Sequence, residues 1–105
     1  MVKLHGRWCG PNWTNNQVIA ARDYLLSGGS FKTKCNDKLD CACREHDRGC
    51  ASSELGCSFD DDTRLMRKAQ AILNNPLYSI TNPSMYAAAA VVANSMAVIR
   101  WTRSR

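Results

Sequence analysis

The chain has 105 residues with six cysteines, and its 14 Lys and Arg against nine Asp and Glu give a formal charge of +5. That length supports one small domain over 1–105 and excludes a doubly wound nucleotide-binding sheet or a TIM barrel. An even number of cysteines in so short a chain favours disulfides and an oxidising compartment over buried thiols. The charge favours an anionic partner such as lipid or nucleic acid, although a solvated basic surface is its commoner cause.

The first third of the chain predicts a loop, a helix and a second loop. Residues 6–13 contain two glycines, a proline and an asparagine, which is typical of an irregular loop. A helix is expected from residue 15 or 16 to 27, because Asn15 and Asn16 are good caps and Gly28–Gly29 would stop it. Loop follows to residue 36.

Three further helices are predicted, over 37–53, 61–74 and 84–101, with a loop over 75–83. Asp37 or Asp40 would cap the first of them, and Asp60 or Asp61 would cap the second. No stretch alternates convincingly between apolar and polar residues, so at most one short hairpin is expected. The predicted fold class is therefore all-α, in a small fold linked by disulfides.

The helix predicted over 37–53 carries reactive side chains on one face. Leu39, Cys43, His46, Asp47 and Cys50 recur at helical spacing and share that face. Burying a histidine and a carboxylate together costs several kcal/mol unless each has a partner. A fold accepts this cost more readily for a functional site than for packing alone.

Asp62 stands at the head of the apolar stripe in the helix predicted over 61–74. An acid in the first turn usually serves the helix dipole. Beside a buried His46, however, this carboxylate would bind one imidazole nitrogen and leave the other free to act as a base. We therefore interpret His46 and Asp62 as a candidate catalytic pair.

The loop over 6–13 offers a candidate metal site. Gly10 and Asn12 allow turns that expose backbone carbonyls in unusual directions. Carbonyl oxygens together with one carboxylate suit a hard cation such as Ca²⁺. A bridge from Cys9 to Cys43 would hold this loop against the helix face that carries the histidine.

These motifs resemble those of the secreted phospholipase A2 superfamily. Residues 8–12, WCGPN, are similar to its calcium loop, and residues 40–50, DCACREHDRGC, are similar to its active-site helix. The Gly-Pro step and the Asp62-x-x-Leu65 spacing look most like the compact domains of parvoviral capsid proteins. The cysteine-linked loop looks more like the secreted cellular and bacterial members. The resemblance covers residues 6–66. It implies a phospholipase A2-like helical fold, with an N-terminal calcium-binding loop and two helices packed antiparallel.

The resemblance implies a calcium-dependent enzyme that cleaves the sn-2 ester of glycerophospholipids. His46 would take a proton from the water that attacks the ester, and Asp62 would hold its ring. The implied calcium ligands are the carboxylate of Asp47 and the backbone carbonyls of Trp8, Gly10 and Asn12. The ion and the Gly10 amide would form the oxyanion hole.

Three features depart from the family pattern. Asn12 stands where a second loop glycine is usual, but asparagine tolerates left-handed backbone, so calcium binding should survive. Cys50 stands where a tyrosine usually supports the carboxylate beside the histidine, so those surroundings must differ. Residues 14–40, which separate the loop from the helix, have no assigned role beyond a lid or lipid contact.

The disulfide pairing is only partly determined by the sequence. The Cys9–Cys43 pair matches the family. The other four cysteines allow three pairings. Of these we favour Cys35–Cys41 together with Cys50–Cys57. The last pair requires the helix to end between its two cysteines.

Three other functions stay open. The spacing of Cys35, Cys41, Cys43 and His46 also suits a zinc module, although this leaves the loop motif unexplained. A catalytically inactive relative could bind membranes or a receptor through its basic surface. The presence of His46, Asp47 and Asp62 together argues against this alternative. A basic nucleic-acid-binding protein has no recognised motif here.

The expected partner is a phospholipid membrane surface rather than a nucleic acid, with a monomer favoured. Candidate lipid contacts are Trp13, Leu25, Leu26, Phe31, Lys32, Lys34 and the tail 100–105. The apolar run over 85–99 is too short to span a bilayer. Because no apolar leader is visible, we expect a mature secreted chain, a domain of a larger protein such as a virion component, or export by another route.

Overall fold

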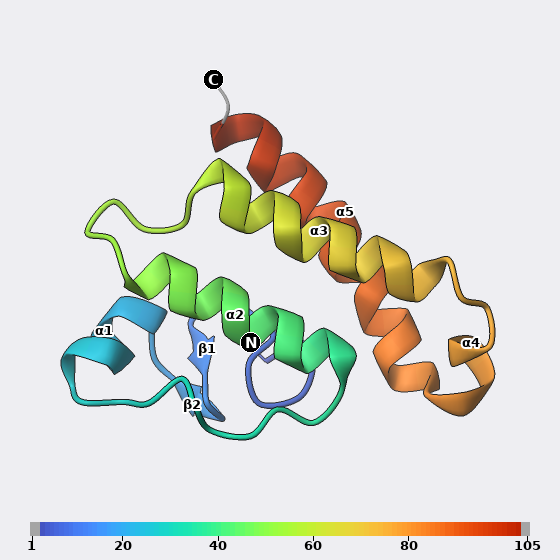
Figure 1. Cartoon of the computed structure of the whole chain (residues 1–105), viewed down its shortest axis with the longest axis horizontal. Helices are drawn as coiled ribbons and strands as arrows, with labels where there is room; N and C mark the ends of the chain where they lie inside the picture. The colour runs from blue at the N-terminus through green and yellow to red at the C-terminus, as the bar shows by residue number, and fades with distance from the viewer. Residues whose placement is uncertain (1–2, 104–105) are drawn as a thin grey trace.

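A computed structural model describes residues 3–103, and these form five helices and one two-stranded sheet (Figure 1). The helices are α1 (Ala21–Leu26), α2 (Lys38–Ala51), α3 (Phe59–Leu73), α4 (Tyr78–Thr81) and α5 (Pro83–Arg103). The strands are β1 (Trp13–Thr14) and β2 (Gln17–Val18). The prediction of a mostly helical chain with at most one short hairpin is confirmed.

Helix α2 lies at the centre of the arrangement. In Figure 1 the hairpin and α1 lie along one side of α2, and α3 lies antiparallel along the other. Helix α5 returns antiparallel to α3 and packs against it. The buried apolar side chains of these elements form one cluster, in which Leu39 of α2 and Ala69 of α3 are fully buried. Among the described residues, no helix is both long and apolar enough to cross a membrane.

The helix predicted from residue 15 or 16 to 27 is wrong over its first part. Residues 13–18 form the antiparallel β1–β2 hairpin instead, and α1 begins only at Ala21. Asn15 and Asn16 have φ angles of 48° and 63°, which is the left-handed backbone that a two-residue hairpin turn requires. Adjacent asparagines therefore make a turn here rather than a helix cap.

The predicted cap of α3 is also wrong. Ser58 precedes the helix, and its hydroxyl accepts a hydrogen bond from the Asp61 amide at 3.0 Å. The Asp61 carboxylate accepts one from the Ser58 amide at 3.0 Å. This reciprocal pair satisfies two helix-end amides at once, whereas an aspartate cap at 60 or 61 would satisfy fewer. The helix therefore begins at Phe59.

The loop predicted over 75–83 contains the short helix α4. Helix α5 then begins at Pro83. Proline suits this first helical position because its missing amide hydrogen has no partner in the first turn of any helix.

Three disulfides link the chain: Cys9–Cys43, Cys35–Cys41 and Cys50–Cys57. They are the pairs that the sequence analysis favoured. The Cys50–Cys57 pair forms because α2 ends at Ala51, so that Cys57 lies beyond the helix and the chain can turn back to Cys50. No cysteine is left free, so the sulfur ligands of the alternative zinc module are all occupied in this oxidised chain.

Residues 14–40, which had no assigned role, support the N-terminal loop. Trp8 is fully buried, with its ring centroid 6.0 Å from that of Tyr24 and 5.5 Å from that of Phe31. Its indole N–H donates to the Lys34 carbonyl at 3.3 Å. Phe31, predicted to contact lipid, instead packs against this core, because an aromatic ring gains more from burial beside other rings than from exposure.

Candidate functional site

His46 on α2 meets Asp62 on α3. The imidazole Nε2 lies 2.7 Å from Asp62 Oδ1. The Asp62 side chain is 0% exposed and that of His46 only 12%. A buried carboxylate at Nε2 favours the tautomer that carries its proton there, which leaves Nδ1 able to accept a proton. The structure therefore brings together the two residues predicted to form the catalytic pair.

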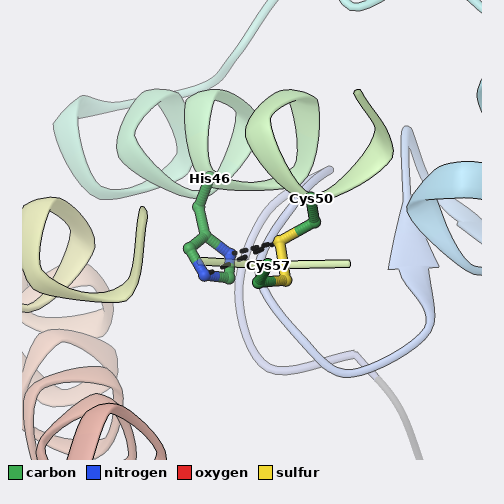
Figure 2. Close-up of side chains that lie close together, drawn as sticks. All are labelled: His46, Cys50 and Cys57. Atoms are coloured by element: carbon green, nitrogen blue, oxygen red, sulfur yellow. Dashed lines mark hydrogen bonds between the residues drawn. A yellow bond between two sulfur atoms is a disulfide. The ribbon is translucent and has the colours of Figure 1, made fainter. Parts of the chain in front are cut away.

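A disulfide lies beside the imidazole (Figure 2). Cys50 follows His46 by one helical turn, and its Sγ lies 3.7 Å from Nδ1 and 3.8 Å from Nε2. His46, Cys50 and Cys57 place their ligand atoms within 4.8 Å of one another, a grouping able to hold a metal. Both sulfurs are bonded to each other, however, and neither offers a thiolate. In this state the disulfide packs against the imidazole ring. The sequence could have suggested this contact, because His46 and Cys50 are four residues apart on one helix.

Asp47 carries the least compensated carboxylate near the histidine. Its Oδ2 is buried and has no hydrogen-bond partner within the described part of the chain. The His46 Nδ1 is 4.0 Å from its Oδ1. Burial and the nearby Asp40 carboxylate raise the pKa of Asp47 to about 9. A divalent cation would supply the missing positive charge, so this environment fits the role of a calcium ligand.

The loop over 6–13 is attached to α2 close to Asp47. Its Cys9 is joined to Cys43, which lies one helical turn before Asp47 on the same face. The disulfide holds the two α-carbons 5.1 Å apart. The loop and the carboxylate thus share one side of α2, as the sequence predicted.

Three loop carbonyls are the remaining predicted ligands. Those of Trp8 and Asn12 accept no hydrogen bond from any residue that the structure describes, and that of Gly10 accepts one from the Trp13 amide at 3.3 Å. Gly10 and Asn12 have φ angles of 139° and 53°, where glycine and asparagine are the best tolerated residues. The loop therefore retains carbonyl oxygens able to bind a hard cation.

Asp40 holds this loop, a role that the sequence analysis missed because it considered Asp40 only as a helix cap. The cap is Asp37, whose carboxylate accepts the Asp40 amide at 2.9 Å. The fully buried Asp40 carboxylate instead accepts the backbone amides of Arg7, Trp8 and Asn36 at 3.2, 2.9 and 2.8 Å. The signal was present in the sequence, since Asp40 lies two turns before Asp47 on the same helical face.

Most of the predicted lipid-contact residues within the described part of the chain are exposed. The exposed members are Leu25, Leu26, Lys32, Lys34, Trp101 and Thr102, whereas Arg100 is half-buried. Trp13 is half-buried, and its indole N–H donates to the Gly6 carbonyl at 3.1 Å. Residues 104–105 of the predicted tail lie outside the described residues.

We expect the calcium-free protein to lose stability as the pH rises from 5 to 8, and Asp47→Asn to reduce that loss. The pKa of Asp47 is 3.8 when solvated and about 9 in the folded chain. The folded state therefore holds a proton that the unfolded state has released, and stability falls with pH across this window. Thermal melts in a chelator at the two pH values measure the effect, and added Ca²⁺ should restore stability at pH 8. Equal pH dependence in both proteins would contradict it.

Comparison of the chain with protein-family profiles, characterised proteins and solved structures finds no match. Function has to be inferred from the residues and geometry of this site.

Proposed function

We propose that this chain is a calcium-dependent phospholipase A2 that hydrolyses the sn-2 ester of glycerophospholipids. The observation that carries the proposal is the 2.7 Å contact between His46 and the buried Asp62, next to the uncompensated carboxylate of Asp47. Hydrolysis by an activated water needs a general base, and a carboxylate beside a histidine base stabilises its protonated form. It also needs positive charge near the ester oxygen, which a calcium site at Asp47 would provide.

In the proposed reaction His46 Nδ1 accepts a proton from the water that attacks the ester carbonyl. Asp62 stabilises the resulting imidazolium through Nε2 and keeps the ring in position. The Gly10 amide donates to the ester oxygen as negative charge develops there. Asp47 and the loop carbonyls of residues 8, 10 and 12 would hold Ca²⁺, which when bound supplies further positive charge to that oxygen. His46 then returns the proton to the leaving alcohol.

The surroundings of the site are compatible with action on lipid outside a reducing cytoplasm. Three disulfides are typical of secreted or virion-exposed chains. The net charge of +5 favours approach to an anionic surface. We propose a phospholipid surface as the partner, a secreted or virion-associated location, and a monomer that binds no nucleic acid.

The test is fatty-acid release from vesicles of phosphatidylcholine and phosphatidylglycerol. We expect release with millimolar Ca²⁺, the scale of extracellular sites, and none with a chelator. Asp47→Asn should be inactive at every Ca²⁺ concentration while keeping its helical circular dichroism. Asp60→Asn is the matched control, because Asp60 is an exposed aspartate of α3, and it should retain full activity. Equal release in the chelator, or no release with Ca²⁺, would overturn the proposal.

A further inference from the structure

A groove of about 540 Å³ runs between α2, α3 and α4. Its lining includes none of the residues proposed for catalysis or calcium binding. The floor is apolar, with the buried Ala42 and Ile72 and the exposed Ala71, and Tyr78 of α4 also lines it. Volumes of roughly 300–1,000 Å³ with an apolar lining and a few polar groups are typical of small-molecule sites.

The rim of this groove is positively charged. Lys38, Arg44 and Lys68 line it, against the single carboxylate of Glu45. That carboxylate already pairs with Arg48 at 2.7 Å and lies 3.4 Å from the Arg44 guanidinium. Neither lysine forms an ion pair with any residue that the structure describes. The two ammonium groups therefore have no acidic partner among the described residues, and that of Lys38 interacts with the Tyr78 side chain.

The position of the charges relative to the floor defines the ligand chemistry. The apolar side chains of Ala42 and Ile72 are buried, whereas a bilayer-docking surface needs apolar side chains that protrude. An inorganic anion would leave the apolar floor unused. The α2 residues that line the groove span 38–45, about 10 Å at 1.5 Å per residue, which suits an alkyl chain of medium length.

We propose that this groove binds a medium-chain fatty-acid anion, with its carboxylate between Lys38 and Lys68 and its alkyl chain along Ala42 and Ile72. The Lys38 ammonium is already positioned at the rim, 5.7 Å from the centroid of the Tyr78 ring. Such a site requires neither calcium nor phospholipase activity.

Titration of the ¹⁵N- and ¹³C-labelled full chain with decanoate in a chelator tests the proposal. We expect saturable binding of one molecule, with the largest chemical-shift changes at Ala71, Ile72 and Tyr78. Decanol lacks the charge and acetate lacks the alkyl chain. Each should bind at least about tenfold more weakly than decanoate, because each loses either the ionic or the apolar contribution to binding. Decanol binding as tightly as decanoate, or no saturable binding, would overturn the proposal.

Two sets of variants locate the site. The double substitution Lys38→Gln and Lys68→Gln should weaken decanoate binding about tenfold, since two exposed charge contacts are lost. The matched control is Lys32→Gln with Lys34→Gln, two exposed lysines outside the groove, which should bind as the parent does. Ala71→Phe should fill the groove and abolish the shifts.

Equal weakening in the two lysine pairs would show nonspecific charge attraction and reject the site. The decanoate titration contains neither calcium nor vesicles. Its outcome is therefore independent of the vesicle assay that tests the proposed phospholipase activity. Thermal melts of each variant check folding, and all five substituted positions are exposed.

Discussion

Replacing His46 with glutamine is expected to reduce fatty-acid release from vesicles by about 10²- to 10⁴-fold, the usual contribution of a positioned general base. Glutamine keeps an N–H donor that can reach Asp62 but has no nitrogen able to accept a proton from water. The folded state should therefore survive while the reaction does not. Initial rates at saturating Ca²⁺ measure the effect, with circular dichroism as the folding check.

Asp62→Asn separates catalysis from packing at the same contact. The Asp62 side chain is fully buried 2.7 Å from Nε2, so asparagine of similar shape keeps the packing but cannot stabilise an imidazolium. We expect a large loss of rate with a helical spectrum close to that of the parent. The exposed Asp60→Asn should have no effect on rate. Full activity in either His46→Gln or Asp62→Asn would exclude the proposed base and its partner.

Replacing Asp40 with alanine is expected to destabilise the protein by about 3 kcal/mol, because three backbone amides, of which that of Trp8 is buried, would lose a charged acceptor. Two of those amides belong to Arg7 and Trp8 in the N-terminal loop, so metal affinity should fall as well. Urea unfolding in a chelator measures the first effect. Terbium luminescence sensitised by the tryptophans of the loop measures the second without any need for activity.

Asp40→Asn provides a second measurement if the alanine variant does not fold. Asparagine keeps one oxygen acceptor but places an amino group where the carboxylate accepted amides, so stability should fall by less than with alanine. Removing the Asp40 charge should also lower the pKa of Asp47, because that charge contributes to its elevation. Asp23→Ala, at an exposed aspartate of α1, is the control. Unchanged stability and terbium affinity in both Asp40 variants would rule out this loop-holding role.

Gly6 offers an independent check of the same contact. A Cβ at Gly6 would lie 2.5 Å from the Asp40 carboxylate, and its φ of +61° is unfavourable for alanine. Gly6→Ala should therefore be destabilising, and less so in the Asp40→Ala background, where the steric clash is absent.

The sequence by itself determined the features that depend on spacing along one helix. Residues 43, 46, 47 and 50 share a face of α2 because the helix repeats every 3.6 residues, whatever packs against it. Among the three pairings that the sequence left open for four of the cysteines, the spacing also favoured Cys35–Cys41 with Cys50–Cys57, the pairs that form. The mostly helical class followed from the absence of period-two alternation.

Only the tertiary structure decided which groups from different segments meet. The spacing placed Asp62 in a first turn but could not show that its carboxylate lies 2.7 Å from His46. Asp40 was interpreted as a helix cap because two of its three amide donors, Arg7 and Trp8, are 33 and 32 positions away in the sequence. Phe31 was interpreted as a lipid contact because Trp8, the ring that it packs against, is distant in the sequence. Local spacing determines which side chains share a face, but burial and hydrogen bonding between segments depend on how the faces pack.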